Sequence, residues 1–157
     1  MKKIFNSFLC RGAIMVFFLV LTGCSVDSIT APNGSTIEVI PSSLSLTGLS
    51  GDTPYNFYAV VKDENSLPLN SVKVHISGSF ASPRSPARYY FYTDMNGGGT
   101  QVNSGFDCIT NEFGQCSFSI IIPATVNNSE NVFTDDIVLN SGSASVTVEI
   151  ALTAASS

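Results

Sequence analysis

The chain has few charged residues and few of the residue types that most often carry chemistry. Only 12% of its 157 residues are charged, it has one histidine and no tryptophan, and 7 Lys and Arg stand against 12 Asp and Glu. One histidine cannot make a histidine-based metal cluster, and the shortage of cations argues against a nucleic-acid partner. No catalytic or cofactor-binding motif is complete, so we expect no enzymatic activity and no cofactor.

The chain nevertheless has enough apolar residues for a folded domain. They make up 44% of it, which excludes a disordered polymer and, at this length, predicts one domain with a buried core. The histidine, His75, alternates with Val74 and Ile76, so we expect a solvated strand residue. A Ser-His-Asp triad would have to be built around it, and no G-x-S-x-G motif supplies the serine.

The first 23 residues have the three-part pattern of an export signal. Cationic side chains precede an apolar run over residues 13–21, and Thr22 and Gly23 supply small residues before Cys24. A bilayer-spanning helix needs about 20 apolar residues, so this short run fits a cleaved signal peptide over residues 1–23. A retained N-terminal membrane anchor is the alternative.

The end of this segment, Leu21-Thr22-Gly23-Cys24, resembles the lipobox of bacterial lipoproteins. In that family the cysteine is acylated, with palmitate-type chains, and the polypeptide is cleaved just before it. The resemblance implies that Cys24 is the first mature residue and the lipid attachment point. Ser25, in place of an aspartate, implies the outer membrane of a bacterial cell envelope, on its periplasmic face or at the cell surface. Ordinary secretion with Cys24 as a free thiol is the alternative.

Removal of the signal peptide would leave a strongly acidic chain. Four basic and twelve acidic side chains would remain, a net charge of −8. Anionic lipid headgroups repel such a body, so the lipid on Cys24 would provide the contact with the membrane. The small polar residues 24–32 suit a short tether, and residues 33–157 would form the domain.

The rest of the chain consists of short alternating segments, which are typical of strands. In residues 55–61 the odd-numbered side chains share an apolar face, and Val72, Val74 and Ile76 share another. With their turn signals, these segments predict about seven strands in an antiparallel β-sandwich, an all-β fold. The clearest strands cover residues 36–40, 55–62, 72–76, 116–122, 133–139 and 145–150.

Several motifs resemble the bacterial Ig-like domains of invasin- and intimin-type proteins. They are Val61-Lys62-Asp63, Pro68, Val72-Lys73-Val74, Thr110 with Gly114 before Phe118-Ser119-Ile120, and the final segment 141–148. The resemblance covers residues 36–152 and implies an Ig-like sandwich with a structural or adhesive role and no shared catalytic site. The chain departs from the family pattern at residues 81–105 and has one domain where the family usually has tandem arrays.

Two cysteines remain in the body of the chain. Because Cys10 would leave with the signal peptide and Cys24 would carry lipid, Cys108 and Cys116 form an even pair. Residues 111–114 read as a turn, so a disulfide between Cys108 and Cys116 would join two neighbouring segments in an oxidising compartment. A redox-active pair is the alternative, although no C-x-x-C spacing supports it.

The segment over residues 81–105 holds the candidate binding patch. Arg84 and Arg88 precede Tyr89-Tyr90-Phe91-Tyr92, and on a strand Tyr90 and Tyr92 share one face. Exposed tyrosines beside arginines are typical of a protein or glycan contact, whereas a half-buried edge strand is the alternative. The acidic clusters at Asp63-Glu64-Asn65 and Asp135-Asp136 could be calcium ligands, but turns account for them without a metal.

These observations predict a membrane-anchored envelope lipoprotein. Its single Ig-like domain would be a non-catalytic structural or adhesive module with a protein or glycan partner in the envelope. The alternative is a ligand-binding module for a glycan or peptide that uses Arg84, Arg88, Tyr90 and Tyr92.

Overall fold

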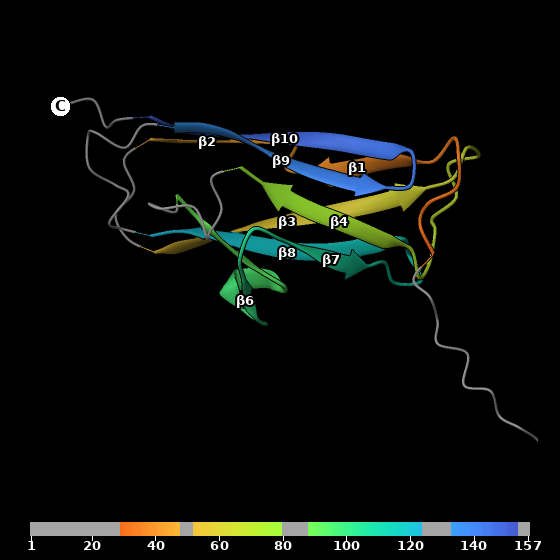
Figure 1. Ribbon diagram of the computed structural model, residues 1–157, viewed down its shortest axis with the longest axis horizontal. Helices are drawn as coiled ribbons and strands as arrows, with labels where there is room; N and C mark the ends of the chain where they lie inside the picture. Colours follow the sequence, from red (N-terminus) through yellow and green to blue (C-terminus); the bar gives the residue numbers. More distant parts are fainter. Residues whose placement is uncertain (1–28, 48–51, 80–87, 124–132, 154–157) are drawn as a thin grey trace, which may run out of the picture.

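The computed structural model describes residues 29–47, 52–79, 88–123 and 133–153 (Figure 1). No helix within these ranges is long and apolar enough to cross a membrane. The elements are β1 (Thr36–Ile40), β2 (Ser43–Thr47), β3 (Thr53–Lys62), β4 (Lys73–Gly78), β5 (Tyr90–Tyr92), the 3₁₀ helix η1 (Met95–Gly97), β6 (Gln101–Val102), β7 (Gly105–Ile109), β8 (Gln115–Ile122), β9 (Phe133–Ser141) and β10 (Ala144–Thr153).

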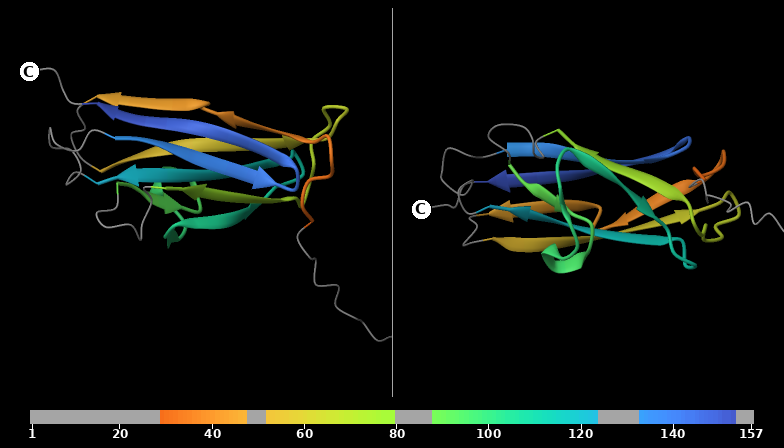
Figure 2. Two further views of the ribbon diagram at one scale, coloured as in Figure 1. Left: turned by 45° about the horizontal axis from the view of Figure 1, so that its top comes forward. Right: turned by 60° about the horizontal axis from the view of Figure 1, so that its bottom comes forward.

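The strands form two sheets that pack face to face (Figure 2). One sheet has the order β1-β3-β8-β5-β6 and the other has the order β2-β10-β9-β4-β7. Every strand pair is antiparallel except β2 with β10, which run parallel. The chain therefore changes sheets between β1 and β2, over Pro41 and Ser42.

This arrangement is an immunoglobulin-like β-sandwich, as predicted. In that fold one sheet holds strands A, B, E and D and the other holds C, F and G. Here β1, β3, β8 and β5 occupy the first four positions, and β4, β9 and β10 occupy the other three. The connection from β4 to its edge neighbour β7 departs from the immunoglobulin pattern, because the chain first crosses to the opposite sheet to form β5 and β6.

The core lies between the sheets and follows the predicted alternation. Phe57, Ala59 and Val61 are fully buried, and so are Val74 and Ile76. Aromatic rings fill the centre: Phe57 stacks on Phe118 with ring centroids 5.0 Å apart, and Phe91 lies 6.2 Å from Phe118. Full burial of one such side chain contributes about 1.5–3 kcal/mol, so these rings are a large part of the stabilising energy.

Strand β1 has the predicted bounds, but the structure has more strands than the seven expected. Strand β2 was not predicted because Leu44 and Leu46 are its only apolar residues and both are only half buried. Strands β6 and β7 are short and begin among polar residues and glycine, where periodicity gives no signal. Near the expected tether, Lys73 N–H donates to the Ile29 carbonyl at 2.9 Å and Ala31 is buried, so the chain already contacts the sandwich there.

The turn between β7 and β8 closes one end of the sandwich. The Thr110 hydroxyl accepts a hydrogen bond from the Val72 N–H at 2.9 Å and donates one to the Leu69 carbonyl at 2.6 Å. Gly114 has φ +69°, and a Cβ there would lie 2.6 Å from the Val61 carbonyl oxygen. Thr110 and Gly114, two residues of the family resemblance, thus have structural roles at this end.

Candidate functional site

The predicted binding patch is only partly within the described residues. Arg84 lies outside them, while Arg88 is half buried just before β5. Tyr90 and Tyr92 share the outer face of their sheet and are half buried, and the Tyr92 hydroxyl donates to Gln101 Oε1 on β6 at 3.0 Å. The structure therefore brings the two tyrosines together on one face, next to the edge strand β6.

The other two aromatic side chains of this segment, Tyr89 and Phe91, enter the core. The carboxyl group of Asp135, which the sequence analysis placed in an acidic cluster, is buried with them. Tyr89 is fully buried, and its hydroxyl donates to Asp135 Oδ2 at 2.5 Å. Burial raises the pKa of Tyr89 far above its usual range, and the hydrogen bond to the Asp135 carboxylate raises it further. A Cβ at Gly78 would lie 1.9 Å from the Tyr89 hydroxyl oxygen, so only glycine fits beside the ring.

Asp135 is therefore a core residue and not part of a surface acidic cluster. Only 6% of it is exposed. The signal was present in the sequence, because Asp135 has the same parity in β9 as Phe133, Ile137 and Leu139, which are all buried. Its neighbour Asp136 points to the opposite face and is exposed.

His75 is on the outer face of β4, as predicted, and is exposed. Its Nδ1 lies 2.8 Å from Asp107 Oδ1, and Lys73 Nζ lies 3.7 Å from Asp107 Oδ2. The hydrogen bond from His75, followed by the charge of Lys73, lowers the pKa of the Asp107 carboxyl. Because all three side chains are solvated, their interactions are weak, and the arrangement is that of a surface ion cluster on a sheet.

The acidic residues at the β3–β4 connection form a turn. Asp63 Oδ1 accepts hydrogen bonds from the N–H groups of Asn65 and Leu67, each at 2.8 Å. An Asx turn of this kind uses the carboxylate as a backbone acceptor. Across residues 29–47, 52–79, 88–123 and 133–153, no group of three or more His, Cys, Asp or Glu side chains is placed to hold a metal ion.

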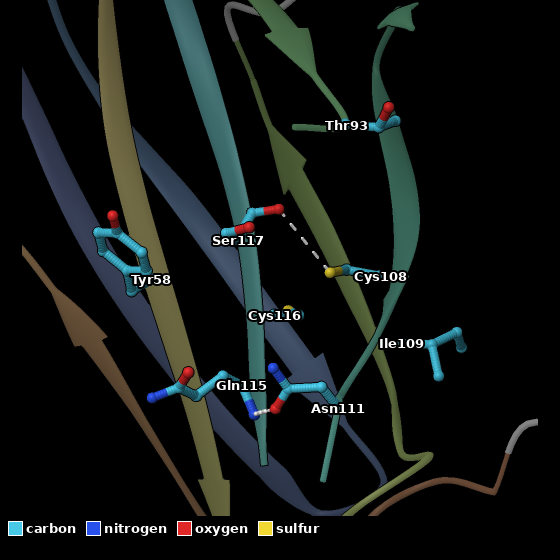
Figure 3. Close-up of a pocket in the computed structure, with 8 residues that line it drawn as sticks. All are labelled: Tyr58, Thr93, Cys108, Ile109, Asn111, Gln115, Cys116 and Ser117. Atoms are coloured by element: carbon cyan, nitrogen blue, oxygen red, sulfur yellow. Dashed lines mark hydrogen bonds between the residues drawn. The ribbon is translucent and has the colours of Figure 1, made fainter. Parts of the chain in front are cut away.

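A groove in the described sandwich is lined by both cysteines (Figure 3). Its volume is about 300 Å³. It opens where β5 ends: β5 pairs with β8 only from Tyr90 opposite Ile121 to Tyr92 opposite Ser119, after which the chain leaves for η1. The lining residues are Tyr58, Thr93, Cys108, Ile109, Asn111, Gln115, Cys116 and Ser117.

Cys108 and Cys116 are free thiols in the structure, which corrects the expected disulfide between them. Cys108 lies on β7 and Cys116 on β8, so they face each other from opposite sheets and not from paired strands of one sheet. The Cys108 thiol donates a hydrogen bond to the Ser117 carbonyl at 4.0 Å (Figure 3). The adjacent Cys116 side chain lowers the pKa of Cys108, whereas Cys108 and burial raise the pKa of Cys116.

Comparisons with known proteins add little to this geometry. No family model matches the chain, and no curated protein matches it. Among solved structures, the chain is similar to the apo form of the Calx CBD1 domain, with 13% identity, a TM-score of 0.36, and coverage of 75% of this chain and 96% of that one. At this TM-score the likeness carries no argument about function.

Proposed function

We propose that the chain is a bacterial envelope lipoprotein, anchored through lipid on Cys24, whose single Ig-like domain is a non-catalytic structural or adhesive module. The observation that carries the proposal is the lipobox-like Leu21-Thr22-Gly23-Cys24 directly after a short apolar run. Two or three acyl chains anchor a protein far more firmly than one. Ser25 favours the outer membrane.

The sandwich is compatible with such a role because several polar side chains that a catalytic or metal site could have used make structural contacts instead. His75, Asp63, Asp135 and Thr110 each have a structural partner. Motifs within residues 36–152 support an Ig-like domain of the invasin and intimin type. The partner in the envelope would be a protein or a glycan.

The test is detergent partitioning and intact mass of the full chain expressed with its own leader in a bacterium. We expect a detergent-phase product that starts at Cys24 and carries acyl mass, whereas Cys24→Ser should be unacylated and remain in the aqueous phase. Cys10→Ser is the matched control, because its mature product would be identical to the wild type. A water-soluble, unacylated wild-type product would refute the lipid anchor.

A second candidate function is recognition of a glycan or peptide by Arg84, Arg88, Tyr90 and Tyr92. The observation that favours it is the placement of Tyr90 and Tyr92 on one outer face. Glycan and peptide arrays probed with the wild type and with Tyr90→Ala/Tyr92→Ala would test it. A signal that the double variant loses supports recognition; a signal that both proteins give equally refutes a role for this face.

A further inference from the structure

We propose that one end of the sandwich is a contact surface for a bilayer of net-neutral lipids. This tether end comprises residues 29–35, the β3–β4 connection and the β7–β8 turn, which lie together at one end of the long axis (Figures 1 and 2). The inference rests on the proposed lipidation of Cys24 and adds to it. The lipid would hold the chain at the membrane, and the tether end would orient the sandwich with its long axis pointing away from the bilayer.

Exposed apolar side chains are concentrated at the tether end. Six large hydrophobic side chains are exposed among the described residues, and four of them lie in or directly beside its segments, with exposed fractions from 49% to 67%. These four are Ile29, Leu67, Ile109 and Phe113. Single exposed hydrophobic residues are ordinary on a protein surface, whereas a group of them marks an interaction site for a protein or a membrane.

The segments that carry these side chains are packed against one another. A Cβ at Gly114 would lie only 2.9 Å from the Pro68 Cβ, so the β7–β8 turn contacts the β3–β4 connection. Phe113 and Leu67 are the exposed neighbours of these two residues. Ile29 forms a parallel β-bridge with the residue that precedes β4. The tether end is therefore one connected structure that can meet a flat surface as a unit.

The short spacing from Cys24 identifies the bilayer as that surface. Ile29 follows Cys24 by five residues, and its carbonyl accepts a hydrogen bond from the Lys73 N–H at 2.9 Å, so the sandwich begins there. Five residues of fully extended chain reach at most about 18 Å. A small folded domain has a diameter of about 30 Å, so no partner domain fits between the tether end and an acylated Cys24. The exposed apolar side chains therefore face the membrane at close range.

The charges of the tether end decide which lipid it accepts. Glu64 and Glu112 are exposed in its two turns, and Asp63 lies beside Glu64. The lysines at the adjoining ends of β3 and β4 are each paired with a carboxylate, at 2.6 and 3.7 Å. Anionic headgroups repel an acidic surface of this kind. Burial of the apolar side chains must therefore drive the contact, and net-neutral lipids should be preferred over anionic ones.

Tryptophan fluorescence is a suitable probe because the chain has no tryptophan of its own. Phe113→Trp and Leu67→Trp each place one indole at the tether end, at positions where the native side chain is already exposed. Ile40→Trp is the matched control. Ile40 is 64% exposed, but it lies on the outer face of the sheet and pairs with Tyr58 in the middle of β3. Bromine on lipid acyl chains quenches tryptophan only at close contact.

Each full chain is expressed in a bacterium with its own leader, checked for acyl mass, and reconstituted into phosphatidylcholine vesicles with or without bromine near the headgroup end of the acyl chains. We expect the Phe113→Trp and Leu67→Trp proteins to lose most of their emission to the brominated lipid. The Ile40→Trp protein should keep nearly all of its emission. Brominated phosphatidylglycerol, which is anionic, should quench the first two proteins less at low salt, and added salt should reduce that difference.

The outcomes separate this inference from the lipid anchor. Acylated, vesicle-bound proteins that are unquenched at all three positions would overturn the membrane contact and leave the anchor intact. Strong quenching of the Ile40→Trp protein as well would show that the sandwich lies on its side, which also overturns the proposal. Equal quenching by the two lipids at low salt would overturn the preference for net-neutral headgroups. A chain without acyl mass would refute the anchor, and the membrane contact with it.

Discussion

Replacement of Tyr89 by phenylalanine tests the buried hydrogen bond between the two sheets. The Tyr89 hydroxyl on the β5 side donates to Asp135 on β9, and both residues are buried. Phenylalanine keeps the ring and its packing against Phe91, which lies 5.4 Å away between centroids. The substitution therefore removes one hydrogen bond and leaves no large cavity.

The expected loss in the free energy of unfolding follows from the charge of the acceptor, the Asp135 carboxylate. A hydrogen bond to a charged group contributes about 1.5–3 kcal/mol. For a domain of this size that corresponds to a fall in Tm of about 5–15 °C. Tyr92→Phe is the matched control. It removes a hydroxyl that bonds Gln101 in an exposed setting, so its cost should stay within about 0.5 kcal/mol.

The pH dependence gives a second readout. Tyr89 has a pKa of 10.0 when unfolded and a higher one when folded. The stabilisation that the Tyr89 hydroxyl contributes is therefore fully present below pH 10. It is lost as the pH rises above 10, because the unfolded chain then releases the phenol proton while the folded chain keeps it. The slope is about 1.4 kcal/mol per pH unit. The stability difference between wild type and Tyr89→Phe should therefore shrink above pH 10.

Urea unfolding of the wild type, Tyr89→Phe and Tyr92→Phe at about pH 8 and about pH 11 measures both effects. Equal free energies of unfolding for the two variants at the lower pH would refute the buried hydrogen bond. A pH-independent difference between wild type and Tyr89→Phe would refute the raised pKa.

Two further substitutions test other parts of the sandwich. Thr110→Ala should lower the free energy of unfolding by about 1–3 kcal/mol, because the Val72 N–H and the Leu69 carbonyl lose their hydroxyl partner; urea unfolding measures this, and Thr110→Ser should retain most of the stability. His75→Ala should raise the pKa of Asp107 towards 3.8, because the main cause of its depression is removed; an NMR titration of the carboxyl carbon would show no shift if the hydrogen bond to His75 is unimportant.

The sequence predicted the parts of the fold in which apolar residues alternate over several positions. The inner faces of β3 and β4 are the predicted ones, because Phe57, Ala59, Val61, Val74 and Ile76 leave only one register that buries them. The pairing of Tyr89 with Phe91 on one face followed from the same rule. These predictions needed only the two-residue period of a strand.

Features that depend on contacts between distant segments were not predictable in this way. Strand β7 exists because β4 offers it an edge, not because residues 105–109 alternate clearly. The Asp135 carboxyl is buried because Tyr89, distant in sequence, supplies a donor. The relation of Cys108 to Cys116 depends on which sheets β7 and β8 join, and sequence spacing alone suggested a bridge between neighbouring strands.

The parallel pairing of β2 with β10 has a mechanical consequence. The described chain starts at Ile29 and stops at Thr153 at opposite ends of the sandwich (Figure 1). A pull along the long axis would drag β2 and β10 in opposite directions, over the register from Ser43 opposite Glu149 to Thr47 opposite Thr153. Because the ladder bonds run across the strands, such a load shears them all at once, so the pair resists tension as a unit and does not unzip bond by bond.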